Sequence, residues 1–315
     1  MFQAQTHFSS EQKLSDVIQQ MAGNSNRMVN EASPIVDTRL ADGSRVNIVL
    51  SPISIDGAAV SIRKFPKTPI LMEDLIRIGS ITEEAAAFLK VLVAAGYNIF
   101  ISGGTGSGKT TFLNALSQYI PREERIITIE DSAELRLVDK PNLVRLETRN
   151  QMFDGVKPIT IRDLIRTALR MRPERIVVGE CRGEEALDML QAMNTGHDGS
   201  LSTGHANSCR DMLSRLETMV LMGMELPLAA IRSQIASGLD ILVHLGRMRD
   251  KSRKVLAITE VIGMQDGEIV LKDLYRYVEK SPDVEMACGK LQQMGTLFNQ
   301  EKCKRAGITL TDTGE

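Results

Sequence analysis

A chain of 315 residues is long enough for two compact domains, and its 43% hydrophobic and 25% charged residues are typical of an ordinary globular protein. The formal net charge of -2 and the absence of tryptophan give no electrostatic or base-stacking reason to expect a nucleic acid as the main partner. The sequence has no signal peptide, no apolar run of the roughly 18 residues that a membrane span needs, and no disulfide framework, so we expect a cytoplasmic protein.

The first 65 residues predict a small α+β domain. Ser9 and Gln12 form a capping-box signal, and apolar residues at helical spacing follow them. Residues 36–50 alternate between apolar and polar on both sides of an Asp-Gly turn, which indicates a β-hairpin. A second Asp-Gly turn, at residues 56–57, also lies between two short apolar alternations and predicts a second hairpin.

Prolines interrupt the chain next. Pro66 and Pro69 exclude regular hydrogen bonding, so we expect a linker over residues 66–80. Helical and buried-strand patterns alternate over residues 81–275, which predicts an α/β domain with a mainly parallel sheet and helices on both faces. The expected helices are 83–94, 111–119 and 161–171, and the expected strands are 98–102, 126–129 and 176–178. The more polar residues 276–315 predict a C-terminal helical segment.

A glycine-rich loop follows the strand at 98–102. It satisfies the pattern GxxxxGK[ST] of a P-loop, and a helix is expected directly after it. Backbone N–H groups of such a loop face a phosphate, its lysine neutralises the β- and γ-phosphates, and its threonine hydroxyl holds Mg²⁺. A glycine-rich turn that binds nothing is the alternative. We therefore expect ATP and Mg²⁺ on the following residues: Gly103, Gly104, Thr105, Gly106, Ser107, Gly108, Lys109, Thr110 and Thr111.

Two groups of carboxylates follow predicted strands. Glu130 and Glu134 come after the strand at 126–129, and Glu180 follows the strand at 176–178. The carboxyl ends of parallel strands form the edge of an α/β sheet at which ligands bind. For either group alone, exposed charges at a strand end are the alternative. Together with a P-loop they predict hydrolysis, in which one carboxylate orients or deprotonates water and another supports the metal.

Two Thr-Gly-His sequences lie close together, at residues 195–197 and 203–205. His205 and Cys209 are one helical turn apart, which raises the alternative of a zinc site, but zinc ligands usually come in closely spaced pairs. His197 and His205 fit better as sensors of the γ-phosphate beside a site for Mg²⁺ and ATP.

Arginines near these segments have two interpretations. Arg162, Arg166 and Arg170 recur at four-residue spacing and are expected to form the solvated face of a helix. Arg45 and Arg63 lie on the N-terminal hairpins instead. An arginine that reaches across a domain or subunit boundary can stabilise transition-state charge, so these two are candidates for that role.

The order of these motifs resembles that of the type II/type IV secretion ATPases. It is more similar still to the CpaF-like ATPases of tight-adherence pilus assembly, over roughly residues 30–275. The resemblance is carried by the P-loop and by these segments: Asp42–Asn47, Ile62–Phe65, Ile129–Asp131, Leu146–Arg149, Val178–Glu180 and Ala186–Ser208. The family usually has a longer N-terminal region, which implies a short form or a fragment, and Cys181 stands where a small aliphatic residue is usual.

The resemblance also implies an architecture and residue roles. It implies a RecA-like domain behind the small N-terminal domain, a hexameric ring, and ATP between the two domains. In such proteins a glutamate at the position of Glu134 activates water, and one at the position of Glu180 organises Mg²⁺ through water. The two histidines would couple nucleotide state to loop position. Arg45 and Arg63 would close over the phosphates, with Arg149 as a further candidate.

We therefore expect a Mg²⁺-dependent ATPase that forms a hexameric motor at the cytoplasmic side of the inner membrane. The motor would drive assembly or export of pilin-like subunits through an inner-membrane platform protein. A nucleic-acid-translocating or conjugative type IV secretion traffic ATPase is the alternative, and a nucleotide-gated scaffold with negligible turnover is a third possibility. The expected catalytic residues are Glu134, Glu180, Lys109, Glu130, His205, Arg45 and Arg63.

Overall fold

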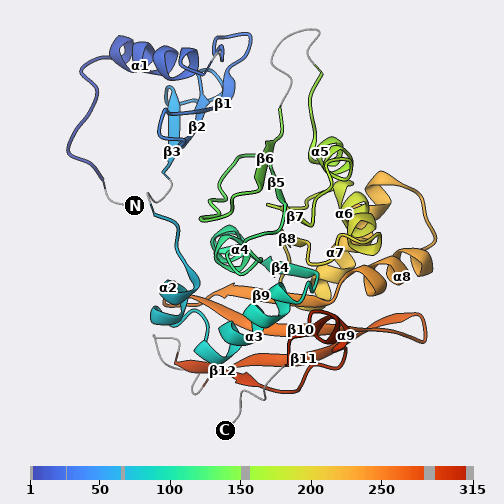
Figure 1. The fold of residues 1–315 in the computed structure, drawn as a ribbon. Coiled ribbons are helices and arrows are strands. Elements are labelled where there is room, and N and C mark those ends of the chain that lie inside the picture. The colour runs from blue at the N-terminus through green and yellow to red at the C-terminus, as the bar shows by residue number, and fades with distance from the viewer. Residues whose placement is uncertain (1–2, 26, 65–67, 150–156, 280–287, 310–315) are drawn as a thin grey trace. The chain divides into compact units, whose positions relative to one another are not determined.

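The structure of the chain is a computed structural model that describes residues 3–25, 27–64, 68–149, 157–279 and 288–309 (Figure 1). It divides into two compact units, of which the first ends at Thr68 and the second begins at Pro69. Each unit has its own hydrophobic core. Pro66, in the predicted linker, lies outside the described residues. Over the residues that are described, no helix is both long enough and apolar enough to cross a lipid bilayer.

The first unit packs one helix against a three-stranded antiparallel sheet. Its elements are α1 (Glu11–Gly23), β1 (Ile35–Arg39), β2 (Arg45–Val49) and β3 (Ala59–Arg63), with the strands in the order β1-β2-β3. The helix begins one residue later than predicted, because the side chain of Ser10 accepts the cap hydrogen bond from the N–H of Lys13. Ile18 of α1 meets Val46 and Ile48 of β2 in the core.

The second predicted hairpin is wrong. Residues 51–57 form turns and bends, and β3 pairs directly with β2. Ile55 is 91% exposed, so its apolar side chain packs against no sheet face. Pro52 has no N–H to donate to a neighbouring strand. A short apolar alternation beside a turn therefore did not identify a strand here.

In the described part of the second unit, nine strands form one sheet in the order β12-β11-β10-β9-β4-β8-β7-β5-β6. The strands from β9 to β6 run parallel, and β10, β11 and β12 extend the sheet beyond β9 in antiparallel pairs. This is the predicted α/β class with a mainly parallel sheet. The strands are β4 (Ile99–Gly103), β5 (Ile126–Glu130), β6 (Leu143–Glu147), β7 (Arg175–Val178), β8 (Leu201–Gly204), β9 (Ile241–Arg247), β10 (Arg253–Gln265), β11 (Glu268–Glu279) and β12 (Gly289–Gln293).

Helices cover both faces of this sheet (Figure 1). They are α2 (Met72–Arg77), α3 (Glu83–Ala94), α4 (Lys109–Ser117), α5 (Ile161–Ala168), α6 (Glu185–Asn194), α7 (Cys209–Gly223), α8 (Leu228–Gly238) and α9 (Glu301–Arg305). Ile99 and Ile101 of β4 face a core shared with α3 and α4, whereas Phe100 faces the core of α5 to α8. Because β4 is buried on both faces, its sequence is an almost continuous apolar run.

Two predicted segments differ from the structure. Residues 69–80 belong to the second unit, because α2 buries Met72 in its core. The C-terminal segment is not a helical cap: β11 continues to Glu279, β12 pairs with it, and α9 is short. An edge strand buries little of its surface, so β12 lacks the apolar run that identifies a central strand. Residues 280–287 and 310–315 of this segment lie outside the described residues.

Candidate functional site

Predicted site residues from four strands meet at one edge of the sheet. Strands β4, β8, β7 and β5 are consecutive parallel neighbours, so their carboxyl ends lie side by side (Figure 1). The P-loop follows β4, His205 follows β8, Glu180 comes two residues after β7, and Glu130 ends β5. The topology therefore brings the P-loop, one histidine and both carboxylate groups to the same edge.

The P-loop connects β4 to α4, as predicted. Lys109 is the first residue of α4, and its Nζ donates to the carbonyl oxygens of Gly103 and Gly104 at 3.1 and 3.2 Å. Gly103 has no room for a side chain, because a Cβ there would lie 2.5 Å from the carbonyl oxygen of Leu245. Gly108 has a φ of 96°, in the left-handed region that favours glycine. The loop conformation thus depends on its glycines.

The loop has the features that a triphosphate needs. The first turn of α4 presents N–H groups without partners inside the helix, and this end of a helix favours anions. Ser107 Oγ is buried and has no hydrogen-bond partner among the described residues. At Gly104 and Gly106 an added Cβ would meet no atom within 4 Å, so there is open space beside the loop. Thr110, in the first turn of α4, offers a hydroxyl oxygen of the kind that Mg²⁺ accepts. These groups fit ATP with Mg²⁺.

His205 links the P-loop lysine to Glu180. Lys109 Nζ lies 3.3 Å from His205 Nδ1, and His205 Nε2 lies 2.8 Å from Glu180 Oε1. Because an ammonium group only donates, Nδ1 must accept, and the ring hydrogen is then on Nε2, the nitrogen that lies beside the carboxylate. Burial lowers the pKa of His205, and Lys109 and Arg182 lower it further, while Glu180 opposes them. A neutral imidazole therefore joins the cation to the carboxylate.

Arg182 belongs to the site, although the sequence analysis did not single it out. Its Nη2 lies 2.6 Å from Glu180 Oε2, and its Nη1 lies 3.6 Å from Asp131 Oδ2. The guanidinium thus joins the carboxylate group after β7 to the one after β5. A usable signal was present in the sequence, because side chains two residues apart in an extended segment lie on the same side.

The segment that carries Glu134 has no regular secondary structure and is held by side chains. Glu130 is 3% exposed, and its Oε2 accepts hydrogen bonds from the N–H groups of Glu134 and Leu135 at 2.7 and 3.0 Å. On the other side, Asn114 of α4 accepts a hydrogen bond from the N–H of Arg136 at 2.8 Å. The Glu130 carboxylate is therefore engaged by the main chain of its own loop.

The structure separates the two Thr-Gly-His sequences. His205 follows β8 at the carboxyl edge of the sheet, whereas His197 precedes β8 at the amino edge. The N–H of His197 bonds to the carbonyl of Ala192, and the neighbouring Asp198 pairs with Lys302 at 2.8 Å. A residue before a parallel strand lies at the end opposite to the ligands. The predicted contact of His197 with nucleotide is therefore wrong within its own chain.

The arginine predictions have different outcomes. Arg166 and Arg170 are exposed, as predicted, whereas Arg162 is mostly buried. Arg162 and Arg166 both pair with Asp188 of α6, at 2.9 and 2.8 Å. Spacing within one helix gave no sign of the acidic partner on another. Arg45 and Arg63 are register partners on β2 and β3 of the first unit. Their contact with phosphates stays a prediction.

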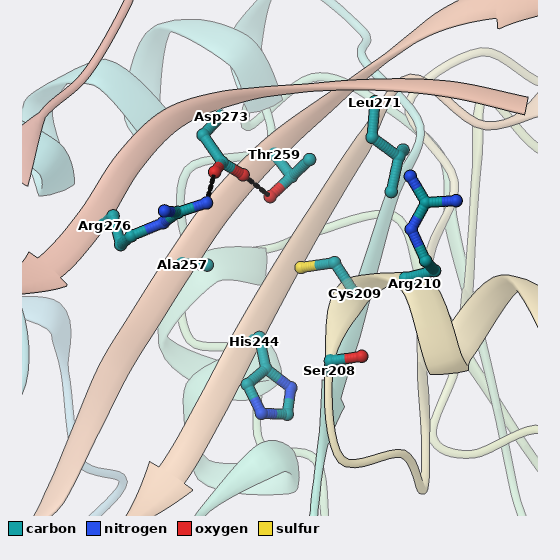
Figure 2. Close-up of a pocket in the computed structure, with 9 residues that line it drawn as sticks. All are labelled: Ser208, Cys209, Arg210, His244, Ala257, Thr259, Leu271, Asp273 and Arg276. Atoms are coloured by element: carbon teal, nitrogen blue, oxygen red, sulfur yellow. Dashed lines mark hydrogen bonds and ion pairs between the residues drawn. The ribbon is translucent and has the colours of Figure 1, made fainter.

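A separate pocket of about 400 Å³ lies where the first turn of α7 meets β9, β10 and β11 (Figure 2). Figure 2 shows Asp273 bonded to both Thr259 and Arg276 in its wall. His244 also lines it, and its Nδ1 lies 2.9 Å from the hydroxyl oxygen of Ser102, directly before the P-loop. None of the predicted site residues lines this pocket, so it is distinct from the edge that carries the P-loop.

Sequence comparison relates the chain to secretion proteins. The family described as "Type II/IV secretion system protein" matches residues 2–306. The type IV secretion system protein VirB11 of Brucella suis is 36% identical over 244 residues, which cover 69% of this chain and 68% of that protein. A Mycobacterium tuberculosis protein described as a conjugal transfer protein is 36% identical over 272 residues, 84% of this chain and 76% of its own length.

Solved structures show the same fold. The VirB11 ATPase of the Brucella suis type IV secretion system, crystallised in complex with sulphate, superimposes with a TM-score of 0.51 at 32% identity, over 79% of this chain and 82% of that chain. The pilus retraction motor PilT with bound ADP gives a TM-score of 0.55 at 22% identity, over 88% of this chain and 70% of that chain. At that identity the likeness to PilT concerns the fold alone.

Proposed function

This chain belongs to the type II/IV secretion system protein family and is an ATPase, and we propose that it uses Mg²⁺ and ATP to power a secretion or pilus-assembly machine. The observation that carries the proposal is the unbroken series of contacts from Lys109 through His205 to Glu180 at the carboxyl edge of the sheet. It joins the phosphate-binding cation to a carboxylate, as hydrolysis requires.

The residues of this edge divide the reaction among them. Lys109 and the N–H groups of α4 would bind the β- and γ-phosphates, and Thr110 would hold Mg²⁺ together with Glu180, which would act through water. Bound Mg²⁺ neutralises phosphate charge in this scheme. Glu134 orients the attacking water and accepts its proton. His205 keeps Glu180 in position, with its Nε2 lying 2.8 Å from Oε1.

Nucleotide binding changes the partners of Lys109 in this proposal. Lys109 bonds to two carbonyl oxygens of its own loop and to His205. A triphosphate competes with these neutral acceptors, because hydrogen bonds between two charged groups are stronger. His205 then loses a partner, and it lies only four residues before the start of α7. We expect the state of the nucleotide to reach α7 through this short connection.

We propose that the working assembly is a hexamer at the cytoplasmic side of the inner membrane. Arg45 and Arg63 of the N-terminal unit would stabilise the charge of the phosphates in this assembly. An inner-membrane platform protein would receive the movement, and pilin-like subunits would be the cargo. The family match and the motif resemblance to CpaF-like ATPases support this assignment.

Transport through a conjugative type IV secretion system is a second candidate function. It is favoured by the similarity to VirB11 and to the mycobacterial conjugal transfer protein. The formal net charge of -2 gives no reason for direct contact with DNA, which depends strongly on basic residues. Stimulation of turnover by single-stranded DNA would favour this candidate over pilus assembly.

The test measures ATP turnover and assembly mass together, with Mg²⁺ present, for the wild type and for Glu134→Gln and Glu180→Gln. The wild type should hydrolyse ATP and reach the mass of six chains. Both variants should keep ATP binding, while turnover falls about 100-fold, because each loses a carboxylate that acts in the chemical step. Wild-type turnover in both variants would contradict the assigned roles.

A further inference from the structure

The N–H groups of the loop between β5 and β6 find hydrogen-bond acceptors on side chains. Buried N–H groups need partners, and this loop has no helix or strand to supply them. Glu130 supplies two acceptor contacts through one oxygen, to the N–H groups of Glu134 and Leu135. Leu135 is buried in the core, so the main chain is fixed at the residue directly after Glu134.

Two side chains of α4 hold the next part of the same loop. Asn114 accepts from the N–H of Arg136 at 2.8 Å. Gln118, the C-cap residue of α4, donates to the carbonyl of Arg136 and accepts from the N–H of Val138, both at 3.2 Å. Because α4 begins at Lys109, the phosphate-binding lysine and this loop are attached to one rigid element.

Glu130 is also packed against the residue before Glu180. A Cβ at Gly179 would lie 3.0 Å from Cγ of Glu130, which is closer than an ordinary contact. The side chain of Glu130 therefore fills the space between its own loop and the end of β7. Its position leaves it buried, at 3% exposure, rather than open to a substrate.

We propose that Glu130 is a positioning residue which, together with Asn114, fixes the main chain at Glu134 so that the Glu134 carboxylate meets the attacking water. This inference rests on the proposed role of Glu134. The sequence predicted Glu130 as a catalytic residue. Its role is instead to accept backbone hydrogen bonds through one carboxylate oxygen, and this role does not require a negative charge.

The environment of Glu130 is consistent with a minor role for its charge. Burial raises the pKa of Glu130 to about 7, although the N–H groups of Glu134 and Leu135 and the charge of Arg145 act to lower it. Its Oε1 is buried and has no hydrogen-bond partner in the described part of the chain. A neutral glutamine keeps one acceptor oxygen for the two N–H groups and can replace the glutamate there.

The experiment compares Glu130→Ala, Glu130→Gln and the matched control Glu147→Gln. Glu147 is the exposed register partner of Glu130 on β6. Glu130→Ala should lower kcat about 10-fold with little change in the KM for ATP, because loss of a positioning contact misplaces the chemistry and not the nucleotide. Glu130→Gln should stay within about 3-fold of the wild-type kcat, like the control.

Asn114 gives an independent arm of the same test. Asn114→Ala removes the acceptor for the Arg136 N–H, whereas Asn114→Asp keeps an acceptor oxygen there. The alanine variant should lower kcat with the same unchanged KM, and the aspartate variant should restore most of it. Loss of kcat in both variants to the same degree would contradict a positioning role for this side chain.

Hydrogen exchange separates this inference from the proposed function. The amides of Glu134 and Leu135 should exchange faster in Glu130→Ala and remain protected in Glu130→Gln, whatever the ATP turnover. Unchanged protection in Glu130→Ala, or a loss of kcat in Glu130→Gln as large as in Glu134→Gln, would overturn the inference. Normal turnover in Glu134→Gln alongside the expected exchange would instead contradict the proposed function.

Discussion

The two edges of the central sheet carry the same tripeptide with different surroundings. At the carboxyl edge, the second Thr-Gly-His places His205 between Lys109 and Glu180. At the amino edge, the first Thr-Gly-His is part of a turn. Arg175 lies beside this turn and forms an ion pair with Glu124. The same tripeptide can therefore take part in the reaction only when it follows a strand of the parallel sheet, because ligands bind at the carboxyl ends of such strands.

The largest effect is expected at the P-loop. Lys109→Ala should weaken ATP binding by about 100-fold, because it removes a charged donor to the phosphates. The control is Lys90→Ala, at an exposed position of α3. Isothermal titration with Mg²⁺ measures both dissociation constants. Equal affinities of the two variants for ATP would contradict phosphate binding by the P-loop lysine.

The two histidines provide the matched pair for the comparison of edges. His205→Ala should lower turnover about 10-fold, because it removes the ring that lies 2.8 Å from Glu180 and keeps this carboxylate in position. His197→Ala should leave turnover within about 2-fold of the wild type. Steady-state ATPase rates decide between them. A larger loss for His197→Ala than for His205→Ala would reverse the roles of the two edges.

The pH dependence of turnover should report on His205. Its pKa is lowered below the ordinary value of 6.5, so the ring is neutral at pH 7 and gains a proton only as the pH falls further. Protonation turns Nδ1 from an acceptor into a donor that faces the Lys109 ammonium. Turnover should therefore fall on acidification below pH 6.5, and His205→Gln should flatten this acid limb. If His205→Gln shows the same loss of turnover at low pH as the wild type, the titration of another group causes that loss.

The smallest effect on turnover is expected from glycine substitutions at the amino edge. Gly199 has a φ of 76°, and a Cβ there would lie 1.4 Å from Nη1 of Arg175, so Gly199→Ala should cost about 3 kcal/mol of unfolding free energy. Gly196 has a φ of 93° but no atom within 4 Å of a Cβ, so Gly196→Ala should cost only about 1 kcal/mol. Denaturant unfolding gives both values. A change in the turnover of folded Gly196→Ala would contradict a purely structural amino edge.

The parts of the fold that the sequence predicted are those whose pattern follows from burial. The run at 98–102 reads as a strand because β4 is covered on both faces, and the same holds for β5 and β7. The edge strand β12 and the short helix α2 were missed, because their identity depends on what they pack against. A local pattern does not contain that information.

The residues of the site likewise differ in whether the local sequence could locate them. The P-loop and Glu180 could be located because each follows a predicted strand, and the carboxyl ends of parallel strands meet. His205 was found from its Thr-Gly-His sequence alone. Asn114 could not be located, because its partner Arg136 lies on another segment and no spacing records such a contact. His197 was grouped with His205 because their tripeptides are identical, although the structure places His197 at the opposite edge of the sheet.

The most direct test of the account is hydrogen exchange of the wild type with and without ATP and Mg²⁺. The account predicts slower exchange after nucleotide addition at the carboxyl edge, in residues 103–111 and 180–182 and in the segment from 204 to 208. It predicts no change at the amino edge, in residues 195–199. Protection confined to the amino edge, or no protection at the P-loop, would contradict the claim that ATP is bound and split at the carboxyl ends of the parallel strands.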